Sequence, residues 1–244
     1  MEIIKAENYE DMSRKAAGII ADHVRQNPSC VLGLATGSTP VGTYQELARL
    51  HRAAGLEFYR VRTVNLDEYY GLAPDHLQSY RHFMNSNFFD HIDILKENTH
   101  VPDGLAPDPR AFGKAYDDLI QAMGGIDLQL LGIGSNGHIA FNEPDRHFVM
   151  ATHLVDLNPS TIEDNARFFA SVEDVPRQAI SMGMKSIFGA KRILILASGA
   201  GKAAAVQGML EGEIDPMLPA SILQLHPRVI LIADKDALSS CKLP

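Results

Sequence analysis

Short runs of apolar residues alternate along the chain with longer stretches in which apolar residues recur every three or four positions. The short runs predict strands, and the longer amphipathic stretches predict helices. The predicted strands cover residues 2–5, 31–35, 61–66, 128–133, 192–197 and 229–233. The predicted helices cover residues 9–25, 40–53, 79–89, 110–123, 177–188 and 202–211. This alternation predicts an α/β fold, a doubly wound, mostly parallel sheet with helices on both faces in a three-layer, Rossmann-like αβα arrangement.

Length, composition and charge narrow the class of protein. With 244 residues and 45% hydrophobic content, we expect one domain over residues 1–244, with a mobile lid around 156–179. The net charge of −8 repels polyanions, so we expect no nucleic-acid partner. Apolar runs are too short to cross a membrane and the first residues are acidic, so we expect no membrane partner and a cytoplasmic location. Cys30 and Cys241 are too far apart in sequence to suggest a thiolate metal site.

In a doubly wound sheet, ligands bind at the carboxyl ends of the strands. After the second predicted strand comes the segment Thr36-Gly37-Ser38-Thr39-Pro40, followed by an amphipathic stretch. Small hydroxyl residues beside a glycine at the start of a helix form a good phosphate cradle. A helix capped by Ser38 or Thr39 explains the segment equally well. The lysine of a nucleotide-binding loop is absent, so a nucleoside triphosphate is not favoured.

Two adjacent carboxylates, Asp67 and Glu68, follow the third predicted strand. Side chains alternate along an extended chain, so at most one of them is expected to face a pocket while the other is solvated or caps a turn. Asp67 is our candidate for a base that removes a proton from carbon next to a carbonyl or imine. A structural cap is the more frequent use of such an aspartate.

A glycine-rich turn after the fourth predicted strand presents His138, bracketed by Asn136 and Glu143. Histidine is the side chain best suited to move protons near neutral pH, and a nearby carboxylate fixes its tautomer. A lone histidine is more often structural, but this setting at a strand end favours a catalytic role.

The same segment matches the dinucleotide-binding pattern G-x-G-x-x-G through Gly132, Gly134 and Gly137, and Asp156 has the spacing of a ribose-binding acid. A dinucleotide site needs a long helix after the third glycine, and Pro144 with the polar residues after it leaves none. We therefore interpret the match as a false positive. For cationic partners of a phosphate, the best placed residues are Arg167 and Lys202, the latter after a glycine-rich turn at the fifth strand.

Taken together, the chain closely resembles glucosamine-6-phosphate deaminases, also described as isomerases, in the smaller version common in Gram-positive bacteria. The resemblance covers nearly the whole chain in the family's order. It is carried by LGLATGSTPVGTY from Leu32, VNLDEYYGL from Val64, LLGIGSNGHIAFNEP from Leu130, NARFF from Asn165 and LQLHP from Leu223.

The resemblance implies the deamination of glucosamine 6-phosphate to fructose 6-phosphate and ammonia in amino-sugar catabolism, by a hydrolase that acts on a carbon–nitrogen bond. It implies that Asp67 moves a proton from C2 to C1, and that His138, positioned by Asn136 and Glu143, opens the sugar ring. It implies no cofactor and no metal. The implied phosphate-binding residues are Gly37, Ser38, Thr39, Arg167 and Lys202.

The chain departs from the family pattern in places. Asn136 replaces an aspartate of larger members, and residues 145–153 lack the usual Ser-Arg-Thr pattern. The basic pair that hexameric members use for an allosteric effector falls on His153 and Val155. We therefore expect a monomer without that control.

Three other functions remain open. A 6-phosphogluconolactonase shares the fold, but its GHxxSLFP segment is absent and Asn142-Glu143-Pro144 stands there. A sugar-phosphate-sensing domain of a transcription regulator needs no catalytic base, but the chain has no basic helical pair for DNA binding. Deamination of galactosamine 6-phosphate differs only in pocket details that sequence does not reveal.

Overall fold

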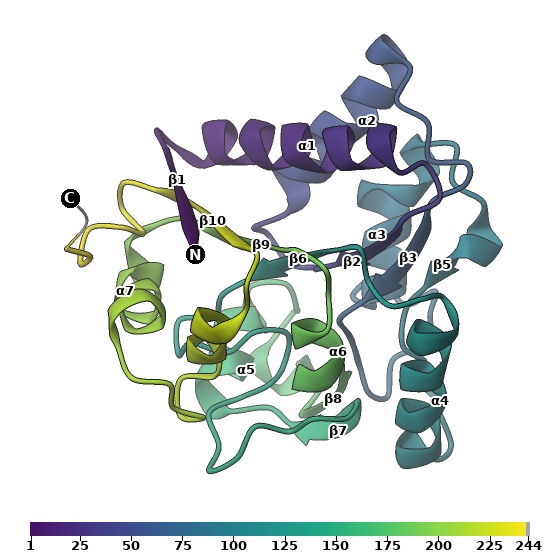
Figure 1. The fold of residues 1–244 in the computed structure, drawn as a ribbon. Helices are drawn as coiled ribbons and strands as arrows, with labels where there is room; N and C mark the ends of the chain where they lie inside the picture. The colour runs from purple at the N-terminus through teal and green to yellow at the C-terminus, as the bar shows by residue number, and fades with distance from the viewer. Residues whose placement is uncertain (243–244) are drawn as a thin grey trace.

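The computed structural model describes residues 1–242, so residues 243 and 244 of the predicted domain lie outside the described part. Its main sheet is parallel throughout, in the order β1-β10-β9-β6-β2-β3-β5 (Figure 1). All six predicted strands belong to it, and the two-residue β5 was not predicted. The strands are β1 (Glu2–Ala6), β2 (Val31–Leu34), β3 (Arg62–Asn65), β5 (Thr99–His100), β6 (Leu128–Gly132), β9 (Ile193–Ala197) and β10 (Val229–Asp234).

Helices cover both faces of this sheet, as the sequence predicts (Figure 1). Strand β9 illustrates the reason: Leu194 and Leu196 pack into one hydrophobic cluster, whereas Ile193 and Ile195 pack into the other. Because both faces of the strand are apolar, both must be covered. One face carries α1 (Tyr9–Gln26), α2 (Val41–Ala54) and α3 (Tyr80–Asn87), and the other carries α4 (Pro109–Ala122), α6 (Met184–Phe188) and α7 (Ala203–Glu211).

Local signals in the sequence explain where helices begin. The side chain of Asn8 accepts the backbone N–H of Asp11 at the start of α1. At the start of α4, Asp108 accepts the N–H groups of Arg110 and Ala111, and Pro109 occupies the first turn, where its missing N–H costs nothing. Such caps contribute about 1 kcal/mol each.

A second, antiparallel sheet lies beside the first, in the order β4 (Asp67–Tyr69), β8 (Gln178–Ser181) and β7 (His153–Asp156). The predicted helix over residues 177–188 is therefore wrong in its first half. The segment forms β8, which is paired on both sides, and only α6 (Met184–Phe188) is helical. The periodicity of so short an apolar run does not distinguish a strand from a helix. The helix α5 (Pro159–Ala166) was not predicted.

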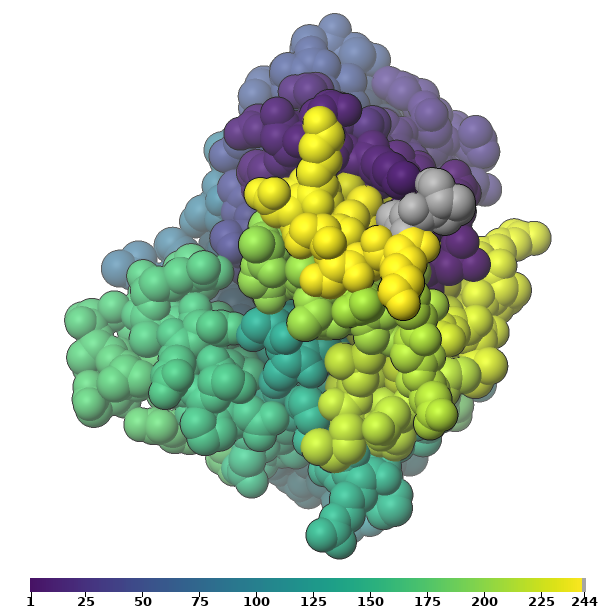
Figure 2. All heavy atoms as spheres, turned by 90° about the vertical axis from the view of Figure 1, so that its left-hand side faces the viewer, coloured from purple at the N-terminus to yellow at the C-terminus, as the bar shows by residue number. Residues whose placement is uncertain are grey.

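The first and last strands of the chain are neighbours in the main sheet. Strand β1 pairs with β10, and the register places Ala6 opposite Asp234. Figure 2 shows the C-terminal residues lying against the N-terminal ones on this side of the molecule. In the part of the chain that the structure describes, no helix combines the length and apolar character needed to span a membrane.

Strand connections reverse direction between β2 and β6, which are neighbours in the sheet. From β2 the chain continues outward through β3 and β5, and from β6 it continues the other way through β9 and β10. A crevice opens where connections diverge in this way, outside the carboxyl ends of the strands. The topology thus fixes where a ligand site is to be sought.

Candidate active site

A cleft of about 360 Å³ lies at this switch point. Segments that follow β2, β3, β6 and β9 line it, together with α5. Seven of the nine predicted site residues line this cleft: Asp67 and His138, together with Gly37, Ser38, Thr39, Arg167 and Lys202. The other two, Asn136 and Glu143, lie behind His138. The volume suits a ligand the size of a sugar phosphate.

The loop after β2 is open to a ligand because its hydroxyl groups do not cap the helix. Helix α2 begins after Pro40 with no side-chain capping bond, so the alternative in which Ser38 or Thr39 caps it is wrong. The Ser38 hydroxyl instead accepts a hydrogen bond from the Arg167 guanidinium at 3.2 Å. This contact joins the loop to the end of α5 and places a cation at the rim of the cleft.

A second turn, after β9, brings Lys202 to the same end of the cleft. Burial lowers the pKa of this ammonium, the carboxylate of Asp164 raises it and the Arg167 guanidinium lowers it. The net shift is downward. An anion bound between Lys202 and Arg167 would relieve both the partial desolvation of Lys202 and the repulsion of the two cations.

Asp67 is the first residue of β4, two positions after the end of β3, and is only 6% exposed. Burial raises the pKa of its carboxyl to about 8, and the neighbouring Glu68 carboxylate adds to the effect, while the Thr36 hydroxyl opposes it. Once ionised, such a carboxylate is a stronger base than one in water.

The neighbouring Glu68 faces away from the cleft, as the alternation of side chains predicts. Its carboxylate accepts the backbone N–H of Tyr69 at 2.9 Å, and those of Tyr80 at 2.8 Å and Arg81 at 2.9 Å. Glu68 therefore caps the first turn of α3, as the predicted alternative of a turn cap for one of the two carboxylates allows.

His138 is seated by its glycine turn. A side chain at Gly134 would meet the imidazole, since its Cβ would lie 2.5 Å from the ring. Nδ1 of His138 lies 3.4 Å from Oε2 of Glu143, within ion-pairing distance, and the backbone N–H of His138 donates to Asn136 at 3.1 Å. The next element after β6 is the strand β7, so this turn lacks the helix that a dinucleotide site needs. Gly134 instead leaves room for the imidazole of His138.

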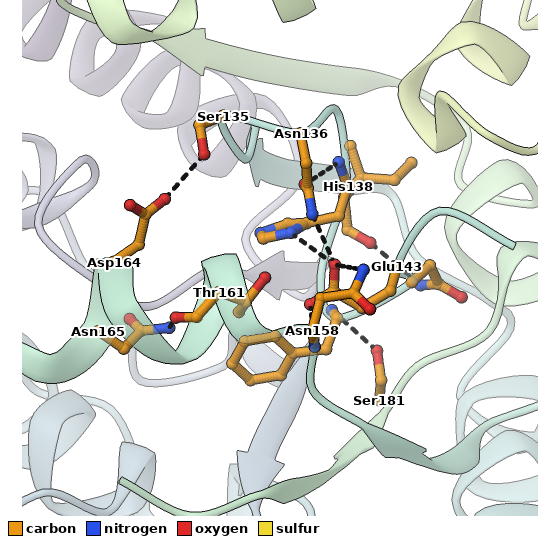
Figure 3. Close-up of polar contacts among 12 residues, drawn as sticks. Ser135, Asn136, His138, Glu143, Asn158, Thr161, Asp164, Asn165 and Ser181 are labelled. Carbon is orange, nitrogen blue, oxygen red and sulfur yellow. Dashed lines mark hydrogen bonds and ion pairs between the residues drawn. The ribbon is translucent and has the colours of Figure 1, made fainter. Parts of the chain in front are cut away.

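Glu143 is held from several sides, as Figure 3 shows. The side-chain amides of Asn136 and Asn158 donate to its Oε2 at 2.8 and 3.1 Å. Burial raises the pKa of Glu143, but the contacts of His138, Thr161 and Asn136 outweigh it and hold the pKa below its ordinary value. The group therefore stays a carboxylate and places a negative charge beside the imidazole.

Several residues at the site were missed by the sequence analysis. Tyr80 lines the cleft beside Asp67, and Asp164 on α5 accepts a hydrogen bond from the Ser135 hydroxyl at 2.8 Å (Figure 3). Asn158 precedes α5 and contacts Glu143 from 15 positions further along the chain. Nothing in the local sequence marks these three residues, because their partners come from other segments. Ser79 caps the start of α3, where its side chain accepts the backbone N–H of His82 at 3.0 Å.

The arrangement can bind an anion at one end and move protons at the other. Asp67 is chemically suited to act as a base, and His138 with Glu143, at a different strand end, is suited to act as an acid–base pair. Among residues 1–242, no group of three or more His, Cys, Asp or Glu side chains is arranged to hold a metal ion.

Comparison with known proteins identifies the family of the chain. Residues 5–231 match the family model of glucosamine-6-phosphate isomerases and 6-phosphogluconolactonase. A glucosamine-6-phosphate deaminase from Clostridium perfringens (strain 13 / Type A) is 56% identical over 237 residues, which are 97% of this chain and 98% of that protein. One from Geobacillus sp. (strain WCH70) is 54% identical over 239 residues, 98% of this chain and 95% of that protein.

Solved structures extend the comparison. A structure described as a monomeric glucosamine-6-phosphate deaminase superposes with a TM-score of 0.96 at 47% identity, over 98% of this chain and all of that one. The 6-phosphogluconolactonase from Trypanosoma cruzi reaches a TM-score of 0.78 at 19% identity, over 99% of this chain and 97% of that one, which is a likeness of fold alone. The chain belongs to the family of glucosamine-6-phosphate isomerases and 6-phosphogluconolactonase.

Proposed function

We propose that this protein converts glucosamine 6-phosphate and water to fructose 6-phosphate and ammonia. Support comes above all from the shared cleft, in which a buried carboxylate and an imidazole face one space with two cationic side chains at its rim. The relatives above 50% identity carry the name of this activity. The 6-phosphogluconolactonases are similar only in fold.

Each group takes one step of the reaction. His138, held against Glu143, moves the proton of the anomeric hydroxyl to the ring oxygen, which opens the ring to an aldehyde at C1. Asp67 then removes the proton from C2 while O1 takes up a proton, which forms an enolamine. Asp67 returns its proton to C1 while the amino group releases one, which leaves an imine at C2. Water adds to C2 and ammonia departs, so the net change is hydrolysis of a carbon–nitrogen bond coupled to isomerisation.

Substrate binding is assigned to the rim of the cleft. Gly37, Ser38 and Thr39 supply backbone and hydroxyl donors to the phosphate, and Arg167 and Lys202 supply charge. The segment 156–179, which carries Arg167, would close as a lid over the bound sugar. The proposal includes a monomer, as in the similar solved deaminase, and a cytoplasmic location, because a lipid bilayer retains a phosphate ester.

The decisive experiment incubates the purified protein with glucosamine 6-phosphate and measures ammonia and fructose 6-phosphate together. We expect equal amounts of both. Parallel incubations with galactosamine 6-phosphate and 6-phosphogluconolactone address the alternative substrates. Absence of ammonia from glucosamine 6-phosphate would reject the proposal, whichever of the alternative substrates reacts.

A further inference from the structure

Two glycine turns frame the phosphate end of the cleft. One contains Gly37 with φ 86°, after β2, and the other contains Gly199 with φ 88°, after β9. A positive φ is the region that L-residues avoid, so each turn has a conformation that the surrounding structure must maintain. Both turns are held by side chains that lie outside the cleft.

Asp234, the last residue of β10, holds the turn after β9. Its buried carboxylate accepts the hydroxyl of Ser198 and the backbone N–H of Gly199 at 3.0 Å, and it also binds the N–H of Ala237. Burial raises the pKa of Asp234, but these hydrogen bonds outweigh it and keep the pKa below its ordinary value. The carbonyl of Gly199 in turn accepts the N–H of Lys202 at 3.0 Å. Asp234 is therefore linked through the backbone of Gly199 to Lys202, one of the two cations proposed to bind the phosphate.

Tyr9, the first residue of α1, holds the turn after β2 in the same way. Its hydroxyl donates to the carbonyl of Ser38 at 2.9 Å and accepts the N–H of Gly42 at 2.9 Å. Space around Gly42 is closed by the same helix, since a Cβ there would lie 2.5 Å from the Ser13 hydroxyl. One phenol thus spans the loop from Ser38 to the first turn of α2.

Asp234 and Tyr9, called the anchors below, come from one corner of the sheet. The register pairs Ala6 at the end of β1 with Asp234 at the end of β10, and Tyr9 follows Ala6 at the start of α1. Within the described residues, neither β1 nor β10 contributes to the lining of the cleft. Asp234 and Tyr9 thus connect this edge of the sheet to two turns that line the cleft.

We propose that Asp234 and Tyr9 are positioning residues that set the two phosphate-binding turns from outside the cleft. The inference rests on the proposed function, because it assigns the ligand of these turns as the phosphate of the substrate. A positioning role predicts weaker binding of phosphate with the proton-transfer machinery intact.

The test compares Asp234→Asn and Tyr9→Phe with matched controls. Asp127→Asn alters a carboxylate that binds the N–H of Val31 at 2.7 Å next to β6, at the opposite end of the strands. Tyr70→Phe removes a phenol that donates to the carbonyl of Ala106 at 3.3 Å. For each protein, KM and kcat with glucosamine 6-phosphate, the affinity for inorganic phosphate by calorimetry, and the melting temperature are measured.

We expect both anchor variants to raise KM and the dissociation constant of inorganic phosphate in parallel by about tenfold, the scale of one or two lost hydrogen bonds at a charged site. The value of kcat should stay within about threefold, and the controls should keep wild-type binding. Should Asp234→Asn fail to fold, Gly199→Ala tests the same turn, because its Cβ meets nothing within 4 Å and only the φ of 88° opposes it.

Unchanged phosphate affinity in folded anchor variants overturns the inference. So does a fall in kcat as large as the rise in KM, because the anchors would then act on the whole site. The calorimetric measurement needs no turnover, so absence of ammonia from the wild-type protein would reject the proposed function and still leave the anchors tested.

Discussion

Replacing Asp67 by Asn should stabilise the fold while it greatly lowers turnover. Burial and the Glu68 carboxylate raise the pKa of Asp67 from 3.8 to about 8. The folded chain therefore keeps a proton that the unfolded chain releases near pH 4. Across this window the native state binds more protons, so the free energy of unfolding falls as pH rises from about 4 to about 8.

The magnitude follows from the width of that window. Each pH unit is equivalent to about 1.4 kcal/mol, so the three units between the unfolded pKa and pH 7 give about 4 kcal/mol as an upper bound. Water in the cleft lowers the cost, and we expect Asp67→Asn to gain about 2–4 kcal/mol at pH 7 and about 1 kcal/mol at pH 5. For a chain of this size the gain at pH 7 corresponds to a rise in melting temperature of about 5–10 °C.

Urea unfolding at pH 5 and pH 7, of the wild type and the variant, measures the effect. Asp103→Asn, the same change at an exposed carboxylate, is the control and should leave stability unchanged at both values. Glu68 is present in both proteins, and the measured difference includes the loss of its repulsion with the Asp67 carboxylate. Turnover should fall about 10²-fold or more, because no other cleft group replaces the base. A variant no more stable than the wild type at pH 7 would refute the reasoning.

Further predictions concern the other groups of the site. Because Asp67 must be ionised to act, kcat/KM should rise with pH up to about 8, the value to which burial raises its pKa; a profile already flat from pH 6 would contradict this. Glu143→Gln removes the charge facing His138 at 3.4 Å and should lower kcat about 10²-fold with KM little changed; a kcat near that of the wild type would remove Glu143 from the reaction. Lys202→Ala should raise KM about tenfold or more and leave kcat largely intact, and an unchanged KM would exclude Lys202 from phosphate binding.

The main sheet could be predicted because its strands are buried on both faces. In β9 every residue is apolar, and in β10 every residue except the terminal Asp234 is apolar; such runs stand out between amphipathic helices. Helices α1 and α4 were equally readable, since Asn8 and Asp108 mark their starts. These elements depend on local chemistry that a single sequence displays.

The second sheet could not be predicted because it depends on distant partners. Strand β8 (Gln178–Ser181) is short and mixes polar with apolar residues. Its pairing with β4 on one side and β7 on the other stabilises the extended conformation. The same is true of the site: Asp67 and His138 stood out at strand ends, whereas Asn158 contacts Glu143 only after the chain has folded. Tertiary contacts override local preference at such places.

Two energetically costly features, a positive φ and a buried carboxylate, lie together in the cleft at the carboxyl ends of the strands. Ala140, the only residue other than glycine with a positive φ among those the structure describes, lines the cleft with φ 53°. Asp67 is buried there without a cation beside it, although burial alone favours its neutral form. A residue in this region of φ costs of order 1–3 kcal/mol, and the buried carboxylate adds a cost of similar size. A fold tolerates such costs when they position reacting groups. Their coincidence in one cleft therefore supports a catalytic use of the cleft, independently of any resemblance.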